Sequence, residues 1–284
     1  MIKAGTIVAG HRIEGVLGEG SGMGLVYRAT QLSLDRTVAL KFLSRELSGD
    51  PQFRERFRRE GRLQATINHP HIAAVYEAGE TEQGMFISMF VVEGPTLKDL
   101  IHARELDASR SLQLLGQVAD ALDAAHAVGL IHRDVKPQNI LIGSSDHAFL
   151  ADFGLTKSPD VEALTETGQL LGTIDYISPE QARALPATSA SDVYALACVL
   201  YECLAGQVPF YRPSEPAALF AHIVDPPPRL SARRPDLPVA LDEVIVRGLA
   251  KAPVERPASA GGLLREAQRA LDGGGEAART GTAG

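Results

Sequence analysis

The chain has 284 residues, of which 45% are hydrophobic, and this is enough to bury a large core in one domain or in two lobes. Its formal net charge of −7 at pH 7 gives no overall attraction to nucleic acid or to an anionic membrane, so we expect no nucleic-acid partner. Because no stretch of about eighteen apolar residues occurs, we also expect no membrane span.

The first residues and the cysteines favour a cytoplasmic protein. His11, Arg12 and Glu14 stand where a signal peptide would need an apolar segment. Cys198 and Cys203 are the only cysteines, and they lie in the apolar run 193–204, where buried free thiols are expected. A reducing compartment fits both observations.

The first third of the chain has the alternation of short antiparallel strands. One helix, 51–67, interrupts these strands and carries Phe53, Phe57 and Leu63 near helical spacing. Five segments between turn residues predict a five-stranded sheet: 12–17, 25–29, 37–42, 74–77 and 85–91.

Arginines are concentrated in the helix 51–67. A solvated face is the simplest interpretation of them, and docking to a phosphate is the alternative. Gly61 in the same helix costs about 1 kcal/mol relative to alanine, which would make the helix easier to displace. The arginines are Arg54, Arg56, Arg58, Arg59 and Arg62.

Glycines gather in the hairpin between the first two strands, at Gly18, Gly20, Gly22 and Gly24. Without side chains they let backbone N–H groups approach a phosphate closely. Glycine content alone is equally consistent with a flexible hairpin that binds nothing, so the order of the other motifs decides between the two.

The chain becomes helical after Thr96. A long helix ends near Ala125, and its apolar side chains recur at helical spacing along one face. Gly273 begins a glycine-rich stretch that predicts a flexible tail, 272–284. Four more helices are expected at 191–205, 215–224, 239–251 and 259–271.

The segment 131–142, Ile-His-Arg-Asp-Val-Lys-Pro-Gln-Asn-Ile-Leu-Ile, has the composition of a phosphotransferase active-site loop. Apolar pairs on both flanks, 130–131 and 140–141, are expected to hold its ends as short buried strands. Asp134 suits accepting a proton from an attacking hydroxyl, and Lys136 suits neutralising a transferring phosphoryl group. Asn139 and Asp152 offer the oxygen ligands that Mg²⁺ prefers.

Together, H-R-D-x-K-P-x-N at 132–139 and D-F-G at 152–154 resemble the signatures of eukaryotic-type protein kinases. The Lys136-Pro137 pair is similar to the serine/threonine version of this loop, and the alanine, glycine and arginine content resembles that of bacterial members. The resemblance covers residues 10–271. It implies an ATP-dependent kinase that phosphorylates protein serine and threonine hydroxyls.

By this resemblance the fold is α+β and two-lobed, with ATP between the lobes. The N-lobe, 1–93, holds a small antiparallel sheet with one main helix, and the C-lobe, 94–271, is larger and mostly helical. The cofactor is Mg²⁺, for which Mn²⁺ can substitute. Proteins are the expected substrates, and a homodimer is one arrangement in which two chains could phosphorylate each other.

The resemblance also assigns residues to the nucleotide. Lys41, in Val-Ala-Leu-Lys, holds phosphates and pairs with Glu60, and these two join Asp134, Lys136 and Asn139 as the catalytic set. Asn139 and Asp152 hold the metal. The ATP-contacting residues are Leu17, Gly18, Gly20, Gly24, Val26, Ala39, Lys41, Phe90, Val92 and Leu141.

The glycine-rich hairpin departs from the family spacing by one extra residue near Ser21. A longer tip could weaken the hold on the phosphates, or the extra residue could bulge away from the nucleotide, and the sequence does not decide between these.

The segment 155–177 resembles a kinase activation segment, and it ends at Ser178-Pro179-Glu180 in place of Ala-Pro-Glu. Thr165 and Thr167 are expected to be autophosphorylated, with Arg133 as the cationic partner of the phosphate, whereas Thr173 is expected to have a structural role. Two structural ties are also expected: Glu180 with Arg256, and Asp192 with the backbone around His132.

Two other functions are alternatives to protein phosphorylation. A pseudokinase would bind nucleotide and regulate partners without catalysis, but Lys41, Asp134, Asn139 and Asp152 are all intact. A small-molecule phosphotransferase has less need of the long segment between Asp152 and Glu180, which suits a docked polypeptide. Fold alone would not separate a protein kinase from a small-molecule phosphotransferase.

Overall fold

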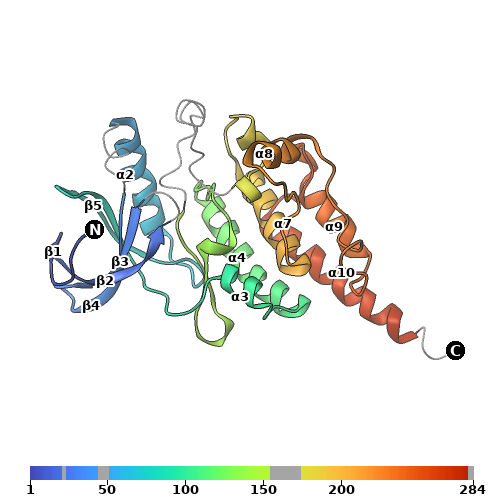
Figure 1. Cartoon of the computed structure of the whole chain (residues 1–284), viewed down its shortest axis with the longest axis horizontal. Helices are drawn as coiled ribbons and strands as arrows, with labels where there is room; N and C mark the ends of the chain where they lie inside the picture. The colour runs from blue at the N-terminus through green and yellow to red at the C-terminus, as the bar shows by residue number, and fades with distance from the viewer. Residues whose placement is uncertain (21–23, 44–50, 154–173, 281–284) are drawn as a thin grey trace. The chain divides into compact units, whose positions relative to one another are not determined.

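A computed structural model of the chain describes residues 1–20, 24–43, 51–153 and 174–280 (Figure 1). These residues form two compact units, with the boundary between Glu93 and Gly94. The extra hairpin residue Ser21 lies outside the described residues, as do Gly154, Thr165, Thr167 and Thr173.

The first unit is built on an antiparallel sheet of six strands in the order β1-β2-β3-β4-β6-β5. The expectation of five strands was wrong by one, because β1 has only two residues, too few to show alternation in a sequence. The strands are β1 (Ile7–Val8), β2 (His11–Gly20), β3 (Gly24–Gln31), β4 (Arg36–Phe42), β5 (Val75–Thr81) and β6 (Gly84–Met89).

One helix, α2 (Pro51–Thr66), packs against this sheet. Its Phe53 and Phe57 are buried in one apolar cluster with Met85 and Ile87 of β6. This burial confirms the helical spacing predicted for Phe53 and Phe57, while the third residue of that pattern, Leu63, is only half-buried. Packing of this apolar stripe stabilises a helix whose opposite face is strongly charged.

Gly24 is fixed by the sheet itself. Its φ is +148°, and a Cβ at this position would lie 1.7 Å from the carbonyl oxygen of Phe42. The backbones of β3 and β4 therefore approach closely only because residue 24 has no side chain. This requirement is structural and is independent of any bound phosphate.

The second unit is mostly helical, as expected. No helix of the described residues is long and apolar enough to cross a membrane. The α-helices of the second unit are α3 (Leu97–Ala103), α4 (Ala108–Ala127), α6 (Pro179–Ala182), α7 (Ser189–Ala205), α8 (Glu215–Val224), α9 (Ala240–Gly248) and α10 (Ala260–Thr280).

Two expectations about this unit were wrong. The last helix does not end at Leu271 but continues to Thr280, because the residues after Gly275 are good helix formers that outweigh the cost of three glycines. The pair 130–131 is not a strand: β7 (Ile140–Ile142) pairs with β8 (Ala148–Leu150), in a sheet of only two strands.

Helix α7 forms the centre of the helical unit, and it is buried from Ser191 to Leu204. Cys198 and Cys203 lie within it as buried free thiols, which confirms their predicted state. A helix that is buried on all sides needs no polar face, and this explains the long apolar run in its sequence.

A buried ion pair fixes the residues just before α7. The guanidinium of Arg256 donates to Glu180 through Nη1 (2.7 Å) and Nη2 (2.7 Å), and the Ser191 hydroxyl donates to Glu180 Oε1 (2.6 Å). The predicted pairing of Glu180 with Arg256 is confirmed. Burial alone would raise the pKa of Glu180, but these hydrogen bonds outweigh it and lower that pKa.

We predict opposite effects of two glycine-to-alanine substitutions on the free energy of unfolding. Gly61→Ala places its Cβ 3.5 Å from the Cβ of Ala78, an ordinary contact, so the gain in helix propensity should stabilise the protein by about 1 kcal/mol. Gly79→Ala places its Cβ 2.7 Å from the buried ring of Phe86 and should destabilise by about 1–3 kcal/mol. Urea denaturation measures both, and a destabilising Gly61→Ala would contradict the packing of α2 described above.

Glu180→Gln should destabilise the protein by about 3–5 kcal/mol, because it leaves the buried guanidinium of Arg256 without a countercharge. The matched control is Arg247→Ala, which breaks an ion pair with Glu266 in which Arg247 is 53% exposed and should cost at most about 1 kcal/mol. Chemical denaturation at neutral pH measures both variants. Equal losses of unfolding free energy in the two variants would show that the buried pair stabilises the protein no more than the exposed pair does.

The same variant should change how stability depends on pH. The pKa of Glu180 in the folded protein lies below its ordinary value of 4.5. Its contribution to stability is therefore complete above pH 4.5 and is lost as the pH falls through the folded pKa. Denaturation midpoints of the wild type and of Glu180→Gln should converge as the pH falls below 4.5, and a constant difference would contradict this.

Candidate active site

The loop between Arg133 and Asn139 is closed by its own asparagine. Pro137 begins a short 3₁₀ helix (Pro137–Asn139), and the Asn139 backbone N–H donates to the carbonyl of Lys136 at 3.0 Å. The Asn139 side-chain amide then donates to the backbone oxygen of Asp134 at 2.8 Å and to its Oδ2 at 3.2 Å. These bonds orient the Asp134 carboxylate and leave the amide oxygen of Asn139 as an acceptor.

Lys136 lies beside this carboxylate in a buried position. Its Nζ is 2.9 Å from Asp134 Oδ2, and the residue is 1% exposed. The contact lies outside hydrogen-bond geometry, so within the described part of the chain the ammonium donates no hydrogen bond. A buried ammonium with unused donors is costly. An anionic oxygen placed beside Asp134 and Lys136 would satisfy it, so these residues fit a phosphoryl group.

His132 connects this loop to the residues before Asp152. Burial lowers the pKa of its imidazole, so the ring is neutral. Its Nδ1 accepts from the Asp134 backbone N–H at 3.2 Å, and its Nε2–H donates to the Ala151 oxygen at 3.0 Å. The ring also packs against Phe153, with 4.6 Å between centroids. One side chain therefore ties the backbones of Asp134 and Ala151 together.

Asp152 lies next to this anchored backbone. The Ala151 N–H donates to the Asn139 oxygen at 2.9 Å, so both polar groups of the Ala151 backbone are bonded to the loop. Asp152 itself has φ of +57°, an uncommon conformation for a non-glycine residue. The chain turns at Asp152 directly after a point fixed to Asn139 and His132.

Asp192 of α7 supports the loop from beneath. It is 1% exposed, and its two oxygens accept the backbone N–H groups of His132 and Arg133, each at 2.8 Å. His126 Nε2 lies 2.7 Å from the same carboxylate. Arg133 has φ of +65°, and these bonds hold that conformation. The predicted brace around His132 is confirmed.

Two contacts to this region were not predicted from the sequence. The side-chain amide of Gln181 caps α6 and also donates to the Arg133 backbone oxygen at 3.1 Å. The spacing of Ser178 and Gln181 is that of a capping box, so the cap could have been predicted, but the bond to Arg133 joins residues far apart in sequence.

The contacts of Glu202 with Tyr176 and Lys98 were also not predicted from the sequence. Glu202 is 2% exposed in α7, it accepts the hydroxyl of Tyr176 at 2.5 Å, and it lies 2.6 Å from Lys98 Nζ. Burial also raises the pKa of Tyr176, which keeps its hydroxyl a donor. The available signal was a carboxylate inside an otherwise apolar helix, which is normally paired when buried. Through these two contacts, Glu202 of α7 connects the 3₁₀ turn Ile174–Tyr176 and Lys98 of α3 to α7.

The first unit holds all the other residues predicted to contact nucleotide except Leu141. Lys41 lies on β4 opposite Val26 of β3 and Ile87 of β6, and it is 4% exposed. Glu60 of α2 is 3% exposed. A charged residue this deeply buried is uncommon unless a partner of opposite charge is present.

Two of the apolar residues predicted to contact ATP lie in one apolar cluster of this unit. Ala39 is buried in it, and Val26 packs against it. Leu17 is 46% exposed on β2. The backbone N–H of Phe90 donates to the Ala74 oxygen at 2.9 Å, so this N–H is already bonded within the first unit.

Of the residues predicted from the sequence, the structure brings Asp134, Lys136 and Asn139 into direct contact within the second unit. Leu141 lies on β7 of that unit, half-buried and opposite Phe149. Lys41 and Glu60 belong to the first unit together with the glycine hairpin.

Comparison with known proteins agrees with this geometry. Residues 11–263 match the protein kinase domain family. The serine/threonine-protein kinases PknH and PknE of Mycobacterium tuberculosis (strain ATCC 25618 / H37Rv) are 42% and 41% identical to this chain over 270 residues, 95% of its length. These residues make up 43% of PknH and 47% of PknE, so the chain spans less than half the length of these curated relatives.

A solved structure is similar over nearly the whole chain. The crystal structure of the Mycobacterium tuberculosis PknI kinase domain is 32% identical, with a TM-score of 0.79, and the match covers 96% of this chain and 100% of that one. Sequence and fold therefore agree, and the chain belongs to the protein kinase domain family, in its bacterial serine/threonine branch.

Proposed function

We propose that this chain transfers the γ-phosphoryl group of ATP to serine and threonine hydroxyls of proteins. One observation carries the proposal: the carboxylate of Asp134, oriented by Asn139, lies 2.9 Å from a buried ammonium of Lys136 that donates no hydrogen bond among the described residues. A general base and a cation with unused donors are adjacent, as phosphoryl transfer to a hydroxyl requires. The names of the relatives support the same activity.

Each residue of the loop has a distinct role in this proposal. Asp134 orients the substrate hydroxyl and accepts its proton. Lys136 donates to an oxygen of the transferring phosphoryl group and stabilises its charge. Asn139 holds Asp134 through its amide N–H groups, and its amide oxygen remains as a ligand for a metal. The brace at Asp192 fixes the backbone directly before Asp134, which favours catalysis by positioning.

We assign the metal to Asn139 and Asp152. An amide oxygen and a carboxylate are hard oxygen ligands, and they suit Mg²⁺, for which Mn²⁺ can substitute. The bound metal would neutralise charge on the phosphates. Asp152 is suited to hold it because the backbone directly before it is bonded to Asn139 and His132.

The residues of the first unit serve the nucleotide. Lys41 holds the phosphates and Glu60 is its proposed partner, both being buried. The base would contact apolar side chains and the hinge backbone, and the phosphates would contact the glycine backbone. The proposed contacts are Leu17, Gly18, Gly20, Gly24, Val26, Ala39, Phe90, Val92 and, in the second unit, Leu141.

The substrates are proteins in this proposal, and a homodimer would allow one chain to phosphorylate another. Nothing in the described site favours a pseudokinase, because its acid–base and charge-stabilising groups are all present.

The first test replaces the two carboxylates. Asp134→Asn should keep ATP affinity but lower kcat by about 10²-fold or more, because it removes the base and leaves the nucleotide contacts. Asp152→Ala should abolish transfer while leaving the fold intact, because it removes a metal ligand. Steady-state kinetics and ATP titration measure both variants, with circular dichroism as the control for folding. Near-normal turnover in Asp152→Ala would overturn the mechanism.

The second test concerns Thr165 and Thr167, which lie outside the described residues. We propose that autophosphorylation of these threonines raises activity, because each phosphate adds a charge of about −1.5 to −2 that can form charge-assisted bonds with Arg133. Peptide mapping after incubation with ATP should find phosphate on both, and the double variant Thr165→Ala/Thr167→Ala should lose activity. Wild-type rates in that variant, or no phosphate at either position, would exclude the proposal.

A further inference from the structure

The peptide unit that joins Arg133 to Asp134 is held at both of its polar groups. Its N–H, which belongs to Asp134, donates to His132 Nδ1 at 3.2 Å. Its carbonyl, which belongs to Arg133, accepts from the side-chain amide of Gln181 at 3.1 Å. Because a peptide unit is planar, these two bonds fix its orientation, and with it the point from which the Asp134 side chain starts.

Gln181 and Asp192 act on Arg133 from two different helices. The N–H of Arg133 donates to Asp192 of α7 at 2.8 Å, and its carbonyl accepts from Gln181 of α6. Arg133 has φ of +65°, and a non-glycine residue keeps such a conformation only where its surroundings hold it. Gln181 therefore contacts the residue whose conformation determines where Asp134 lies.

The amide of Gln181 is oriented by Ser178. Its Oε1 accepts from the Ser178 hydroxyl at 2.9 Å and from the Ser178 backbone N–H at 3.3 Å. A backbone N–H can only donate, so the amide oxygen must lie on this side and the two amide N–H groups on the other. A flipped amide would place an oxygen against the carbonyl of Arg133. The cap of α6 thus directs a donor at the catalytic loop.

The buried ion pair described above anchors the helix that carries Gln181. Glu180, the residue before it, accepts two hydrogen bonds of 2.7 Å from Arg256. The 3₁₀ turn Ile174–Tyr176 ends two residues before Ser178, where α6 is capped. The position of this part of the chain is therefore transmitted to Arg133 through one side chain.

Capping alone does not explain a glutamine at this position. Glutamate in the third position of a helix also completes a capping box with serine, and its negative charge suits a helix N-terminus better than an amide does. An amide differs from a carboxylate by its donors, and Gln181 directs a donor at Arg133. The bond to the catalytic loop accounts for the residue type.

We propose that Gln181 is a positioning residue for the catalytic base: its bond to Arg133 aligns Asp134 while α6 and the turn before it are in place. The proposal rests on the proposed function, because alignment of Asp134 matters to the rate only if this carboxylate serves as the base. Gln181 acts through the Arg133–Asp134 peptide and does not need to touch the substrate. Displacement of α6 would then slow phosphoryl transfer without weakening the binding of ATP.

Three substitutions of Gln181 separate its donor from its acceptor. Gln181→Glu keeps the acceptor that caps α6 and removes the donor to Arg133. Gln181→Lys keeps a donor and removes the acceptor, and Gln181→Met removes both without adding a charge. We expect kcat to fall by about tenfold or more in Gln181→Glu and Gln181→Met, and by less than about threefold in Gln181→Lys. The melting temperature should instead fall most in Gln181→Lys and Gln181→Met, which lose the cap.

Turnover is measured as transfer of phosphate from radiolabelled ATP to dephosphorylated casein and to the chain itself. Calorimetric titration measures the Kd for ATP, which should be unchanged in all three variants of Gln181. Circular dichroism measures the melting temperature. A fall in kcat at constant Kd distinguishes misalignment of the base from damage to the nucleotide site.

Gln117 of α4 provides a matched control in the same unit. Its Nε2 donates to the Asp146 backbone oxygen at 2.9 Å, and its Oε1 accepts from the Ala148 N–H at 2.8 Å. This amide bonds to two backbone groups as Gln181 does, but neither of them belongs to the catalytic loop. Gln117→Met should lower the melting temperature and leave kcat unchanged.

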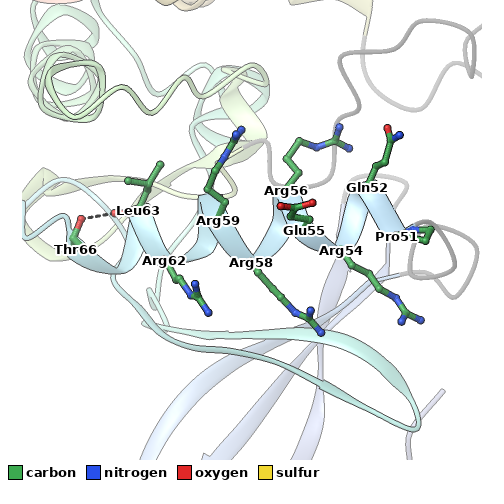
Figure 2. A pocket seen from close by; sticks show the side chains of 10 residues that line it. All are labelled: Pro51, Gln52, Arg54, Glu55, Arg56, Arg58, Arg59, Arg62, Leu63 and Thr66. Carbon is green, nitrogen blue, oxygen red and sulfur yellow. Dashed lines mark hydrogen bonds between the residues drawn. The ribbon is translucent and has the colours of Figure 1, made fainter.

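A second control lies in the first unit. The Thr66 hydroxyl donates to the backbone carbonyl of Leu63 at 2.7 Å (Figure 2). Thr66→Val removes this side-chain donor from a carbonyl oxygen without changing the size of the side chain, and kcat should stay at the wild-type value.

Combination with Asp134→Asn separates positioning from a general loss of structure. If Gln181 acts through the Asp134 carboxylate, adding Gln181→Met to Asp134→Asn should lower the remaining rate by less than about twofold, because the aligned group is already absent. A general structural defect would lower the rate by the same factor in both backgrounds.

Four results would overturn the proposal. These are a wild-type kcat in Gln181→Glu and Gln181→Met, a kcat in Gln181→Lys as low as in Gln181→Met, an equal loss in Gln117→Met, and an undiminished effect of Gln181→Met on Asp134→Asn. If Gln181→Met fails to fold, Gln181→Glu, which keeps the cap, replaces it in every comparison. A wild type that transfers no phosphate would overturn the proposed function as well, whereas an active wild type with any of these four results overturns only the role of Gln181.

Discussion

The buried carboxylate of Asp192 is the constraint on which the catalytic loop depends. A carboxylate that is 1% exposed must have its lone pairs satisfied, and here backbone N–H groups of two successive residues and one imidazole do so. To offer both N–H groups to one carboxylate, the chain turns through a left-handed conformation at Arg133. That turn determines where the next residue, Asp134, begins, and His132 and Asn139 then fix its backbone and its side chain. The helical unit therefore transmits the rigidity of its central helix to a loop whose regular structure is limited to the short 3₁₀ helix Pro137–Asn139.

Much of this arrangement could be predicted because chemistry and short spacing coincide in it. Asp134, Lys136 and Asn139 lie close in sequence, so a motif already implies that they are neighbours in space. Glu180 with Arg256 and Asp192 with His132 are distant pairs, and only the resemblance to a family could predict them. The features that were missed have a different character. Strand β1 is too short for a periodic pattern, and the partners of Glu202, Lys98 and Tyr176, are far from it in sequence.

The glycines show why composition alone could not assign a role. Gly24 was predicted to let a phosphate approach, yet a side chain at this position would meet the backbone of Phe42 whether or not a nucleotide is bound. Gly61 was expected to weaken α2, and the structure adds that space for a methyl group exists beside it. In both cases the sequence marked a glycine as unusual, but only its neighbours in three dimensions show whether a side chain would fit there.

The two thiols at the centre of α7 have a consequence for redox chemistry. Burial raises the pKa of both Cys198 and Cys203 well above the ordinary range, and each residue is at most 7% exposed. The thiolate is the form that reacts with peroxides, disulfides and alkylating agents, so both sulfurs are chemically silent while α7 stays packed. Oxidants have no cysteine through which to control this chain in its folded state. A thiol-reactive probe would in turn be consumed only by molecules whose central helix has opened, and the rate of labelling would report that opening directly.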